Sequence, residues 1–501
     1  MNMTIVEMLE RNAAILPEKT AIIYGNLKIS NREFHERSRT LANFLISMGL
    51  KKGDRVGLVL QKTPEVIISF LGVACAGGIV FPVDYNQTHE NIEYLLKQTD
   101  PTMMIVDGQF QNLISQFTKY GSEKKIIVVG QKETGQHLSW DDVFARPLLD
   151  PPDVQIQDED IVYLNFTSGT TGFPKGAVTT HANIYWNTLS AIESLGLTEE
   201  DIHVCMFPVF SHPHELFARS LYLGGTAVLI EGIYPKTLAA AITEHRVTCM
   251  MAVASIYDTL ARLPLSAPFD LSSLRIPESG GMYTHPTLEE KFTERFDVSI
   301  IPVWGSTETS GIALVSPVAG DRRPGSMGKP SPYYEVKVVG DDGEELPPDE
   351  VGEMLIKGAG VCSRYYNQPE ETKKYMKDGW YCTGDMVKKD RDGYYYFASR
   401  KTGMMKVAGV KVFPLEIEGV LLNHPLIEEA AVIKIQDRLR GEVPKAIIVV
   451  KQGFEISKEE VQKYCEEKMS RIKVPSVIEF RTDLPKTPGG KILYRELQSE
   501  S

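Results

Sequence analysis

The chain has 501 residues, of which 43% are hydrophobic and 24% are charged. This length exceeds what one hydrophobic core usually holds and predicts more than one domain. The 66 acidic and 54 basic side chains give a formal net charge of −12, which argues against a nucleic-acid backbone as the main partner. One anionic nucleotide in a locally positive pocket remains compatible with this charge.

The cysteines, the N-terminus and the apolar runs give information on the cellular location of the protein. The six cysteines form no Cys-x-x-Cys pair, which favours a reduced, cytoplasmic setting. The N-terminus lacks the basic region and long apolar core of a signal peptide. The longest apolar run, residues 70–83, is broken by glycines and a proline and is too short for a transmembrane segment. The sequence leaves the oligomeric state open.

Apolar, strand-like runs alternate with amphipathic stretches through the first 300 residues. Helices are predicted at residues 63–75 and 90–98, and strands at residues 22–24, 55–60, 79–81, 103–106 and 125–129. Such alternation is typical of α/β layers with largely parallel sheets.

The sequence pattern changes from about Ser326, where the predicted strands become shorter and glycines and charged residues separate them. Residues 334–339 and 352–356 alternate as half-exposed strands of a β-rich subdomain. A boundary is predicted near Ser399 to Gly403, followed by helices at 414–422 and 458–469 and strands near 430–435 and 446–450. The predicted fold class is α/β: a large N-terminal domain of layered α/β subdomains plus a β-rich subdomain (residues 1–399), and a small, mobile α+β C-terminal domain (residues 400–501).

A loop rich in glycine and hydroxyl groups follows the strand-like run at residues 161–166. Hydroxyls, unobstructed backbone N–H groups and the cation of Lys175 are what a phosphate chain requires. The spacing is not that of the common P-loop, because Lys175 lies three residues after Gly172 and precedes Gly176. A polar surface loop is the alternative interpretation. The phosphate-binding candidates are Thr167, Ser168, Gly169, Thr170, Thr171, Gly172 and Lys175.

Further segments combine glycines with polar or aromatic residues that suit a nucleotide. They are Ser279-Gly280-Gly281-Met282, Trp304-Gly305-Ser306-Thr307-Glu308, Tyr381-Cys382-Thr383-Gly384-Asp385, Ser399-Arg400-Lys401 with Lys406 to Val412, and Pro485 to Lys491.

In this order, and with the phosphate loop, these segments resemble the signature motifs of the adenylate-forming enzymes. That superfamily holds acyl-CoA synthetases, luciferase and peptide-synthetase adenylation domains, and the pattern here is closest to the acyl-CoA synthetases. The resemblance covers nearly the whole chain. It implies that the protein uses ATP, Mg²⁺ and either coenzyme A or the phosphopantetheine of a carrier protein.

The resemblance also implies how the nucleotide is held. Trp304 would stack on the adenine, and an aromatic face suits that contact. Asp385 and Arg400 would reach the ribose. The other residues of this ATP/AMP site would be Gly280, Gly281, Met282, Gly305 and Ser306.

Three residues are implied as catalytic. Thr307 would hydrogen-bond the α-phosphate, and Glu308 would be the ligand of Mg²⁺, which prefers oxygen donors. Lys491 would enter the cleft on its Pro-Gly-Gly loop and stabilise charge on the α-phosphate. Outside this motif, a C-terminal lysine is usually a solvated surface residue.

The C-terminal motifs imply a hinge and a thiol passage. Thr402 stands at the hinge position, where relatives usually have Asp or Lys. Gly409 lacks a side chain, so a pantetheine arm could pass its backbone, with Lys406 nearby.

The implied acyl pocket is mostly apolar, which favours a fatty or aryl acid. Val303 and Met282 are bulkier than the Gly and Ala that many relatives carry there. A cluster of His203, Cys205, His212 and His214 suggests zinc, but its spacing fits a pocket wall better. The predicted pocket residues are Phe207, Phe210, His212, Val303, Ser310 and Gly311.

The predicted function is an ATP-dependent carboxylic acid–thiol ligase that acts through an acyl-adenylate, an AMP-forming acyl-CoA synthetase for a fatty or aryl acid. The partner is a small-molecule carboxylic acid. One alternative is a stand-alone ligase that loads the phosphopantetheine of an acyl carrier protein. Another is a non-enzymatic nucleotide-binding regulator, which would be expected to lack Lys491 or Glu308. An α-amino acid is a less favoured substrate, because Ser211 rather than Asp follows Phe210.

Overall fold

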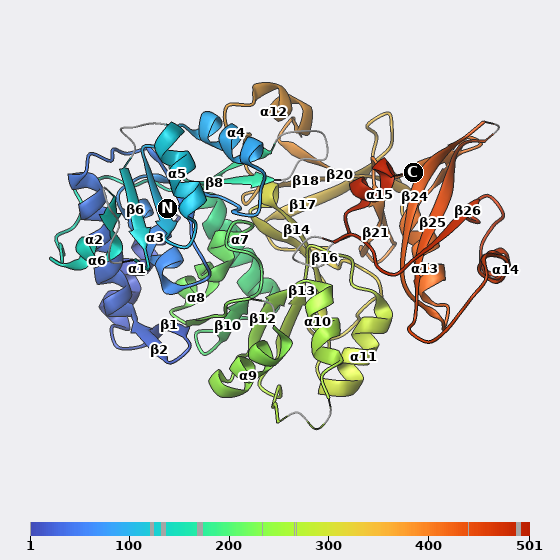
Figure 1. Cartoon of the computed structure of the whole chain (residues 1–501), viewed down its shortest axis with the longest axis horizontal. Helices are drawn as coiled ribbons and strands as arrows, with labels where there is room; N and C mark the ends of the chain where they lie inside the picture. Colours follow the sequence, from blue (N-terminus) through green and yellow to red (C-terminus); the bar gives the residue numbers. More distant parts are fainter. Residues whose placement is uncertain are drawn as a thin grey trace.

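The structure is a computed structural model that describes residues 2–120, 125–131, 137–167, 174–232, 234–264, 266, 268–438, 440–486 and 492–500. Two large sheets and a smaller one form the first 400 residues. A further sheet with its own helices lies at the opposite end of the molecule from α2 and α6 (Figure 1).

The seven-stranded sheet has the order β7-β6-β5-β3-β4-β8-β9. Its strands are parallel except β9, which runs antiparallel to β8. The strands are β3 (Arg55–Val59), β4 (Ile79–Pro82), β5 (Met103–Asp107), β6 (Lys125–Val129), β7 (Leu138–Ser139), β8 (Ile161–Thr167) and β9 (Lys175–Thr180).

The nine-stranded sheet has the order β16-β15-β14-β13-β12-β10-β11-β1-β2, with a parallel centre and antiparallel edges. Its strands are β1 (Thr20–Tyr24), β2 (Leu27–Ser30), β10 (Ile202–Cys205), β11 (Thr226–Leu229), β12 (Cys249–Ala252), β13 (Ile276–Ser279), β14 (Ile301–Ser306), β15 (Gly311–Val315) and β16 (Lys329–Pro330).

A layer of helices lies between these two sheets and forms the main hydrophobic core with them. One of them, α3 (Pro64–Cys75), is buried at every position except Glu65, as expected for a helix that is apolar all round. The others in this layer are α1 (Ile5–Ile15), α2 (Asn31–Ser47), α7 (His181–Leu195) and α8 (Ala218–Leu223).

The outer faces of the sheets carry the remaining helices of this region. α4 (His89–Thr99) and α5 (Gln111–Tyr120) cover the seven-stranded sheet. The nine-stranded sheet is covered by α9 (Pro235–His245), α10 (Ala254–Ala261) and α11 (Pro286–Phe296). The short elements are α6 (Trp140–Phe144), η1 (Pro213–Leu216) and η2 (Thr307–Thr309).

An antiparallel five-stranded sheet follows, in which β17, β18 and β20 pair in order and β19 and β21 pair with β20. The elements are β17 (Tyr334–Val339), β18 (Val351–Gly358), α12 (Pro369–Tyr375), β19 (Met376–Lys377), β20 (Trp380–Lys389) and β21 (Tyr395–Arg400).

The C-terminal part has its own hydrophobic clusters on both faces of its sheet. Its elements are β22 (Met405–Val407), β23 (Val410–Val412), α13 (Pro414–Leu422), β24 (Ile427–Asp437), β25 (Gly441–Val450), α14 (Lys458–Lys468), β26 (Val477–Arg481) and α15 (Tyr494–Ser499). Two ion pairs join this part to the preceding residues, Arg262 with Glu428 at 3.1 Å and Lys411 with Asp341 at 3.2 Å. Solvated pairs of this kind contribute little stability, so they do not lock the two parts together.

The structure confirms the α/β class, the largely parallel sheets and the β-rich subdomain after Ser326. Each predicted strand and helix overlaps an observed one. The domain boundary at 399/400 remains a prediction, and it falls inside β21.

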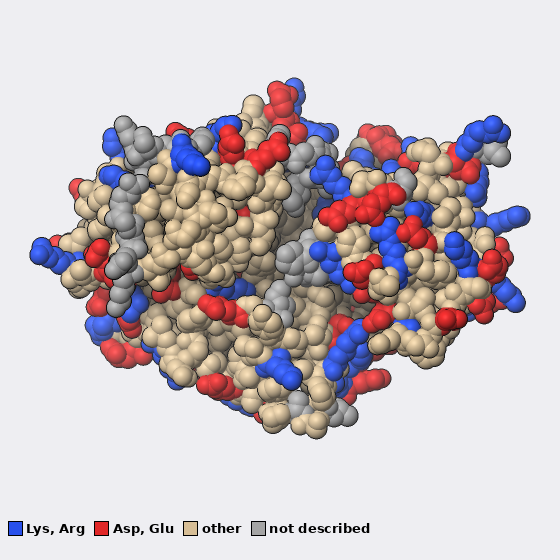
Figure 2. All heavy atoms as spheres, in the orientation of Figure 1, with Lys and Arg blue, Asp and Glu red and all other residues tan. Residues whose placement is uncertain are grey.

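Figure 2 shows acidic and basic side chains mixed over the C-terminal part and scattered over the rest of this face. Among the described residues of this face, no broad basic stripe is visible.

Candidate active site

Trp304, Asp385 and Arg400 meet at one place, although they come from β14, β20 and β21. The Trp304 indole Nε1 donates to Asp385 Oδ2 at 2.9 Å, and Arg400 Nη1 lies 2.9 Å from Asp385 Oδ1. Asp385 is 2% exposed, whereas the Arg400 side chain is 52% exposed. The buried carboxylate therefore fixes the indole ring and holds a cation that solvent can reach.

Glu308 lies in the short helix η2, directly after β14. Ser306 caps this turn, with its Oγ accepting from the Thr309 backbone N–H at 3.3 Å. The Tyr365 hydroxyl donates to Glu308 Oε1 at 2.7 Å, and Tyr381 also hydrogen-bonds this carboxylate. Burial and the charge of Glu308 raise the pKa of both phenols well above the ordinary value.

The partners of Glu308 suit a metal ligand. Within the described residues its side chain forms no ion pair, and both hydrogen-bond donors are neutral phenols. A buried carboxylate without a cationic partner has a net charge that Mg²⁺ could balance. The residues present therefore fit the implied ion. The described ranges contain no cluster of three His, Cys, Asp or Glu side chains that could hold a metal, so the zinc alternative has no support.

Close contacts or backbone conformation account for three motif glycines. A Cβ on Gly305 would lie 2.3 Å from the Gly311 carbonyl oxygen, since β14 and β15 approach closely there. A Cβ on Gly280 would lie 2.9 Å from Val303 Cγ2 and 4.0 Å from the Phe207 ring. Gly281 has a φ of +74°, which favours glycine.

Lys175 begins β9 rather than ending a loop. Its Nζ lies 2.9 Å from Glu371 Oε2 and 3.7 Å from the centre of the Tyr375 ring. Its side chain is 9% exposed, so in this arrangement it is occupied by α12. Its role at a phosphate remains a prediction. Thr167 ends β8, and Ser168, Gly169, Thr170, Thr171 and Gly172 lie outside the described residues, as does Lys491.

The predicted acyl-pocket residues gather near the ends of β10, β13 and β14. Val303 and Phe207 flank Gly280, and the Phe207 and His212 rings lie 6.2 Å apart. Phe210 packs edge-on against Tyr85. Met282 is partly buried, one residue after Gly281.

Ser310 and Gly311 form a tight turn beside the histidines. Ser310 has a φ of +54°, and its carbonyl lies 2.9 Å from His214 Nε2. The other ring nitrogen of His214 lies 2.8 Å from the Tyr163 hydroxyl. Burial lowers the pKa of His203, His212 and His214 to about 4, so all three are neutral near pH 7. Their role as a pocket wall remains a prediction.

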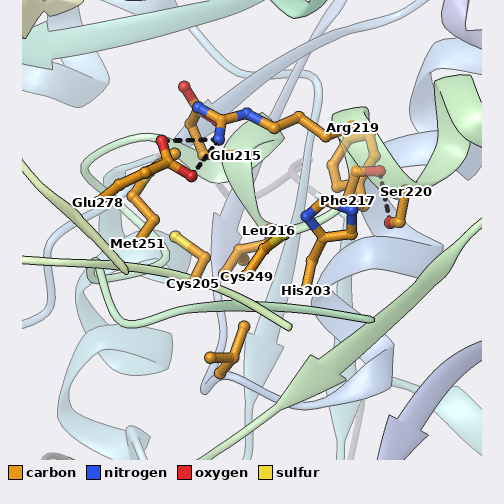
Figure 3. Close-up of a pocket in the computed structure, with 11 residues that line it drawn as sticks. His203, Cys205, Glu215, Leu216, Phe217, Arg219, Ser220, Cys249, Met251 and Glu278 are labelled. Atoms are coloured by element: carbon orange, nitrogen blue, oxygen red, sulfur yellow. Dashed lines mark hydrogen bonds and ion pairs between the residues drawn. The ribbon is translucent and has the colours of Figure 1, made fainter. Parts of the chain in front are cut away.

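A buried ionic cluster behind this wall was not foreseen from the sequence. Arg219 Nη1 lies 2.6 and 2.8 Å from the two oxygens of Glu278, and Arg219 Nη2 lies 3.3 Å from Glu215 Oε2 (Figure 3). Burial raises the pKa of Glu278 despite the opposing charge of Arg219. The four-residue spacing of Glu215 and Arg219 was the signal available in the sequence.

Thr402 lies in an exposed turn after β21. The Lys401 backbone N–H donates to the Gly384 carbonyl at 2.8 Å, and the Lys401 Nζ lies 2.6 Å from Glu353 Oε2. Gly409, with a φ of +85°, forms the exposed tip of the β22–β23 hairpin, and a Cβ there would meet nothing within 4 Å. Lys406 is exposed on β22. The thiol-passage role of Gly409 and Lys406 remains a prediction.

No helix in the described ranges is long and apolar enough to cross a membrane. All six cysteines are buried and unpaired.

Comparison with known proteins gives the same picture across the chain. The family described as AMP-binding enzyme matches residues 9–366, and the AMP-binding enzyme C-terminal domain matches residues 416–491. The chain is 32% identical to a long-chain-fatty-acid–CoA ligase of Bacillus subtilis (strain 168), over 100% of this chain and 95% of that protein. It is 29% identical to a feruloyl-CoA synthase of an Amycolatopsis species, over 97% of each.

Among solved structures, the anthranilate CoA ligase AuaEII in complex with anthranoyl-AMP superposes with a TM-score of 0.92 and 30% identity. The match covers 100% of this chain and 97% of that one. The resemblance stated from the motifs is therefore confirmed, and the chain belongs to the AMP-binding enzyme family of adenylate-forming enzymes.

Proposed function

We propose that the protein is an AMP-forming acid–thiol ligase that makes an acyl-CoA from a fatty or aryl acid. The observation that carries this proposal is the continuous segment from β14 to η2. It places Trp304, bonded to Asp385, and Glu308, bonded to Tyr365, only four residues apart. Family membership and the acyl-CoA ligases among the relatives support it.

In the first half-reaction, a carboxylate oxygen of the acid forms a bond to the α-phosphorus of ATP, and pyrophosphate leaves. Trp304 and Asp385 would orient the nucleoside, and Arg400 would add a donor at the ribose. Thr307 and Lys491 would stabilise the negative charge that develops at the α-phosphate. The loop from Thr167 to Lys175 would hold the outgoing phosphates.

Glu308 would hold Mg²⁺. The ion would neutralise charge on the phosphate oxygens. The chain supplies the Glu308 carboxylate, and the phenols of Tyr365 and Tyr381 fix the position of this carboxylate.

In the second half-reaction, a thiol sulfur attacks the acyl carbon, the thiol proton is lost and AMP leaves. A rotation about Thr402 would remove Lys491 and bring the β22–β23 hairpin into the site. The exposed turn at Thr402 and the weak ion pairs between the two parts support such a movement.

Coenzyme A is the proposed acceptor. A carrier-protein phosphopantetheine is the second candidate, because both present the same pantetheine thiol. A cytoplasmic setting is proposed from the six buried, unpaired cysteines.

Incubation with ATP, Mg²⁺, coenzyme A and a panel of fatty and aryl acids tests this function. The proposal expects one AMP, one pyrophosphate and one acyl-CoA per turnover for at least one acid. Thioester formation only on a phosphopantetheinylated carrier protein would select the second acceptor. Release of ADP instead of AMP would contradict the proposal.

A further inference from the structure

The cavity behind the predicted acyl pocket contains polar groups that the proposed chemistry does not use. It lies between β10, β12 and β13 on one side and η1 and α8 on the other (Figure 3). Its volume is about 10 Å³, close to the least space that holds one oxygen atom with its hydrogens. Its lining includes Glu215, Arg219, Glu278 and His203.

The strand β13 relates this cavity to the predicted acyl pocket, because Glu278 lines the cavity and Gly280 follows the strand directly. Glu278 and Gly280 are two residues apart on and just after β13, so they face the same side of the sheet. Gly280 borders Val303 and Phe207, the pocket wall. Two residues of strand span about 7 Å, roughly the length of one substituted benzene ring, and this is the separation of Glu278 from Gly280 along β13.

Glu215 borders the pocket from the other side. A Cβ on Gly311 would lie 2.5 Å from Glu215 Oε1, so this oxygen lies against the turn that follows Thr307 and Glu308. Glu215 thus lies against the Gly311 turn, and Glu278 lies two residues before Gly280.

The polar groups around this space are not mutually satisfied. Two carboxylates face one guanidinium, and Glu215, Arg219 and Glu278 are 8%, 4% and 1% exposed. Arg219 Nε has no hydrogen-bond partner, and its side chain lines the cavity. Lys62, the other cation nearby, donates instead to the Cys205 carbonyl at 2.9 Å. The cavity thus offers both an unused N–H donor and carboxylate acceptors.

We infer that the acid activated by this protein carries a hydroxyl group at the end far from its carboxyl group. The hydroxyl would donate to Glu215 or Glu278 and accept from Arg219 Nε. This inference rests on the proposed function, because it assigns the inner end of the acyl pocket.

Hydrogen bonding selects the hydroxyl over other groups. A hydroxyl is both donor and acceptor, so it can satisfy the carboxylates and Arg219 Nε together. A methyl group would leave Arg219 Nε unpaired in a desolvated space. An ammonium group could pair with the carboxylates but would face the guanidinium. A second carboxylate would be repelled by Glu215 and Glu278.

Acid-dependent ATP–pyrophosphate exchange with matched acids tests the inference on the unmodified protein. The pairs are 4-hydroxybenzoate with benzoate, 4-hydroxycinnamate with cinnamate, and 6-hydroxyhexanoate with hexanoate. We expect the hydroxylated member of at least one pair to have the higher kcat/KM, by about 10²-fold or more, because a site built for a hydroxyl can reject its deoxy analogue by up to ~10⁴–10⁵. The pair that responds shows whether the hydroxyl is aromatic or aliphatic.

Variants of the buried ionic cluster test whether the preference for the hydroxylated acid arises there. Replacing Arg219 and Glu278 by Met together with Glu215→Gln removes all three charges, so no buried charge is left without its partner. This triple variant should reduce the preference to below about tenfold while retaining exchange with the deoxy acid. Glu215→Gln should reduce it partly. Glu193→Gln, an exposed change on α7, should leave the ratio unchanged.

Equal use of the two members of every pair, or a better deoxy acid, would overturn the inference and identify the cluster as a structural ion pair beside a water. A preference for 4-aminobenzoate or 6-aminohexanoate over the hydroxyl acids would also overturn it. Absence of exchange with every acid, including unsubstituted fatty and aryl acids, would contradict the proposed function itself.

Discussion

Glu308 and Glu278 are both buried carboxylates, yet their partners give them different chemistry. Glu308 is held by the Tyr365 phenol at 2.7 Å, which leaves its charge available to a metal ion. Glu278 binds the Arg219 guanidinium through both oxygens, so most of its charge is already balanced. Both residues are glutamates, so the group that each carboxylate binds, a phenol or a guanidinium, distinguishes the proposed metal ligand from the residue in the cavity wall.

The change Glu308→Gln should keep the Tyr365 hydrogen bond and lose the charge. We expect the ATP–pyrophosphate exchange rate to fall by about 10²–10³, comparable with the loss of one preorganised charge-stabilising group. The Mg²⁺ concentration for half-maximal rate should rise. Tyr365→Phe is the control and should cost about tenfold or less, because the carboxylate remains. An unchanged Mg²⁺ dependence in Glu308→Gln would refute the assignment.

Glu418 gives a prediction about pH. It lies in α13, is 5% exposed and accepts from the Val432 N–H and the Tyr494 hydroxyl. Burial raises its pKa to about 7. Because the folded state holds the proton more tightly, its stabilising effect is complete below about pH 4 and is lost as the pH rises to about 7.

Glu418→Gln should remove this pH dependence. Relative to the unmodified protein, the variant should become more stable as the pH rises from about 4.5 to 7, by about 3 kcal/mol in all, the free energy that corresponds to the raised pKa of Glu418. All four tryptophans precede Arg400, so hydrogen exchange of the β24 amides is the suitable measurement. A constant difference across this pH range would contradict the shifted pKa.

Some site residues could be named from the sequence and others could not. Trp304, Glu308 and Asp385 each lie in a continuous motif, so their resemblance to residues of the family could be recognised from the sequence. The structure places Trp304 in contact with Asp385. Arg219 and Glu278 are 59 residues apart and meet only because α8 packs on β13. No periodicity encodes such a pairing.

At the scale of elements, a turn at Thr402 and the β22–β23 hairpin follow β21 and carry the roles predicted for the second half-reaction. Alternating apolar runs were enough to predict the parallel strands, since buried strands of this kind form continuous apolar segments. The strand β9 was not foreseen, because its first residues belong to the phosphate-loop motif. Its pairing with β8 depends on contacts across the sheet.

Thr402→Pro should impair rotation at the hinge. The Thr402 N–H has no hydrogen bond within the described residues, so proline removes none there, but it fixes φ at its own position and restricts Lys401. We expect pyrophosphate exchange within about threefold of normal and thioester formation from presynthesised acyl-AMP to fall at least about tenfold. Equal loss of both activities would argue against a hinge here.

Gly409→Leu should also damage the second half-reaction selectively. The tip is exposed and open, so a side chain would not disturb packing, although its φ of +85° adds about 1–2 kcal/mol of local strain. Ala408→Gly, at a φ of +49° on the same tip, is the matched control and should relieve strain without blocking the thiol. Thioester rates that fall equally in both variants would exclude obstruction of the pantetheine arm.

At the scale of the whole molecule, separate hydrophobic clusters allow the parts to keep their own structure. Sequence patterns predicted these layers but could not predict how the two parts face each other, because contacts between distant segments, such as the ion pairs of Arg262 with Glu428 and Lys411 with Asp341, carry no periodic signal. This arrangement suits an enzyme that presents two faces of its C-terminal part in turn.

Lys491→Ala should separate the two half-reactions. Adenylation should fall by about 10²–10³, because one transition-state donor is lost. Thioester formation from presynthesised acyl-AMP should remain near normal, since Lys491 would have left the site by then. Failure of Lys491→Ala to use acyl-AMP would contradict the alternation of faces.

The most direct test of the account is pyrophosphate exchange into ATP by the unmodified protein, measured with one acid at a time and no thiol present. The account predicts exchange that requires both the acid and Mg²⁺ and that is accompanied by enzyme-bound acyl-AMP. ATP binding without exchange for every acid tested would contradict it and would favour a nucleotide-binding regulator.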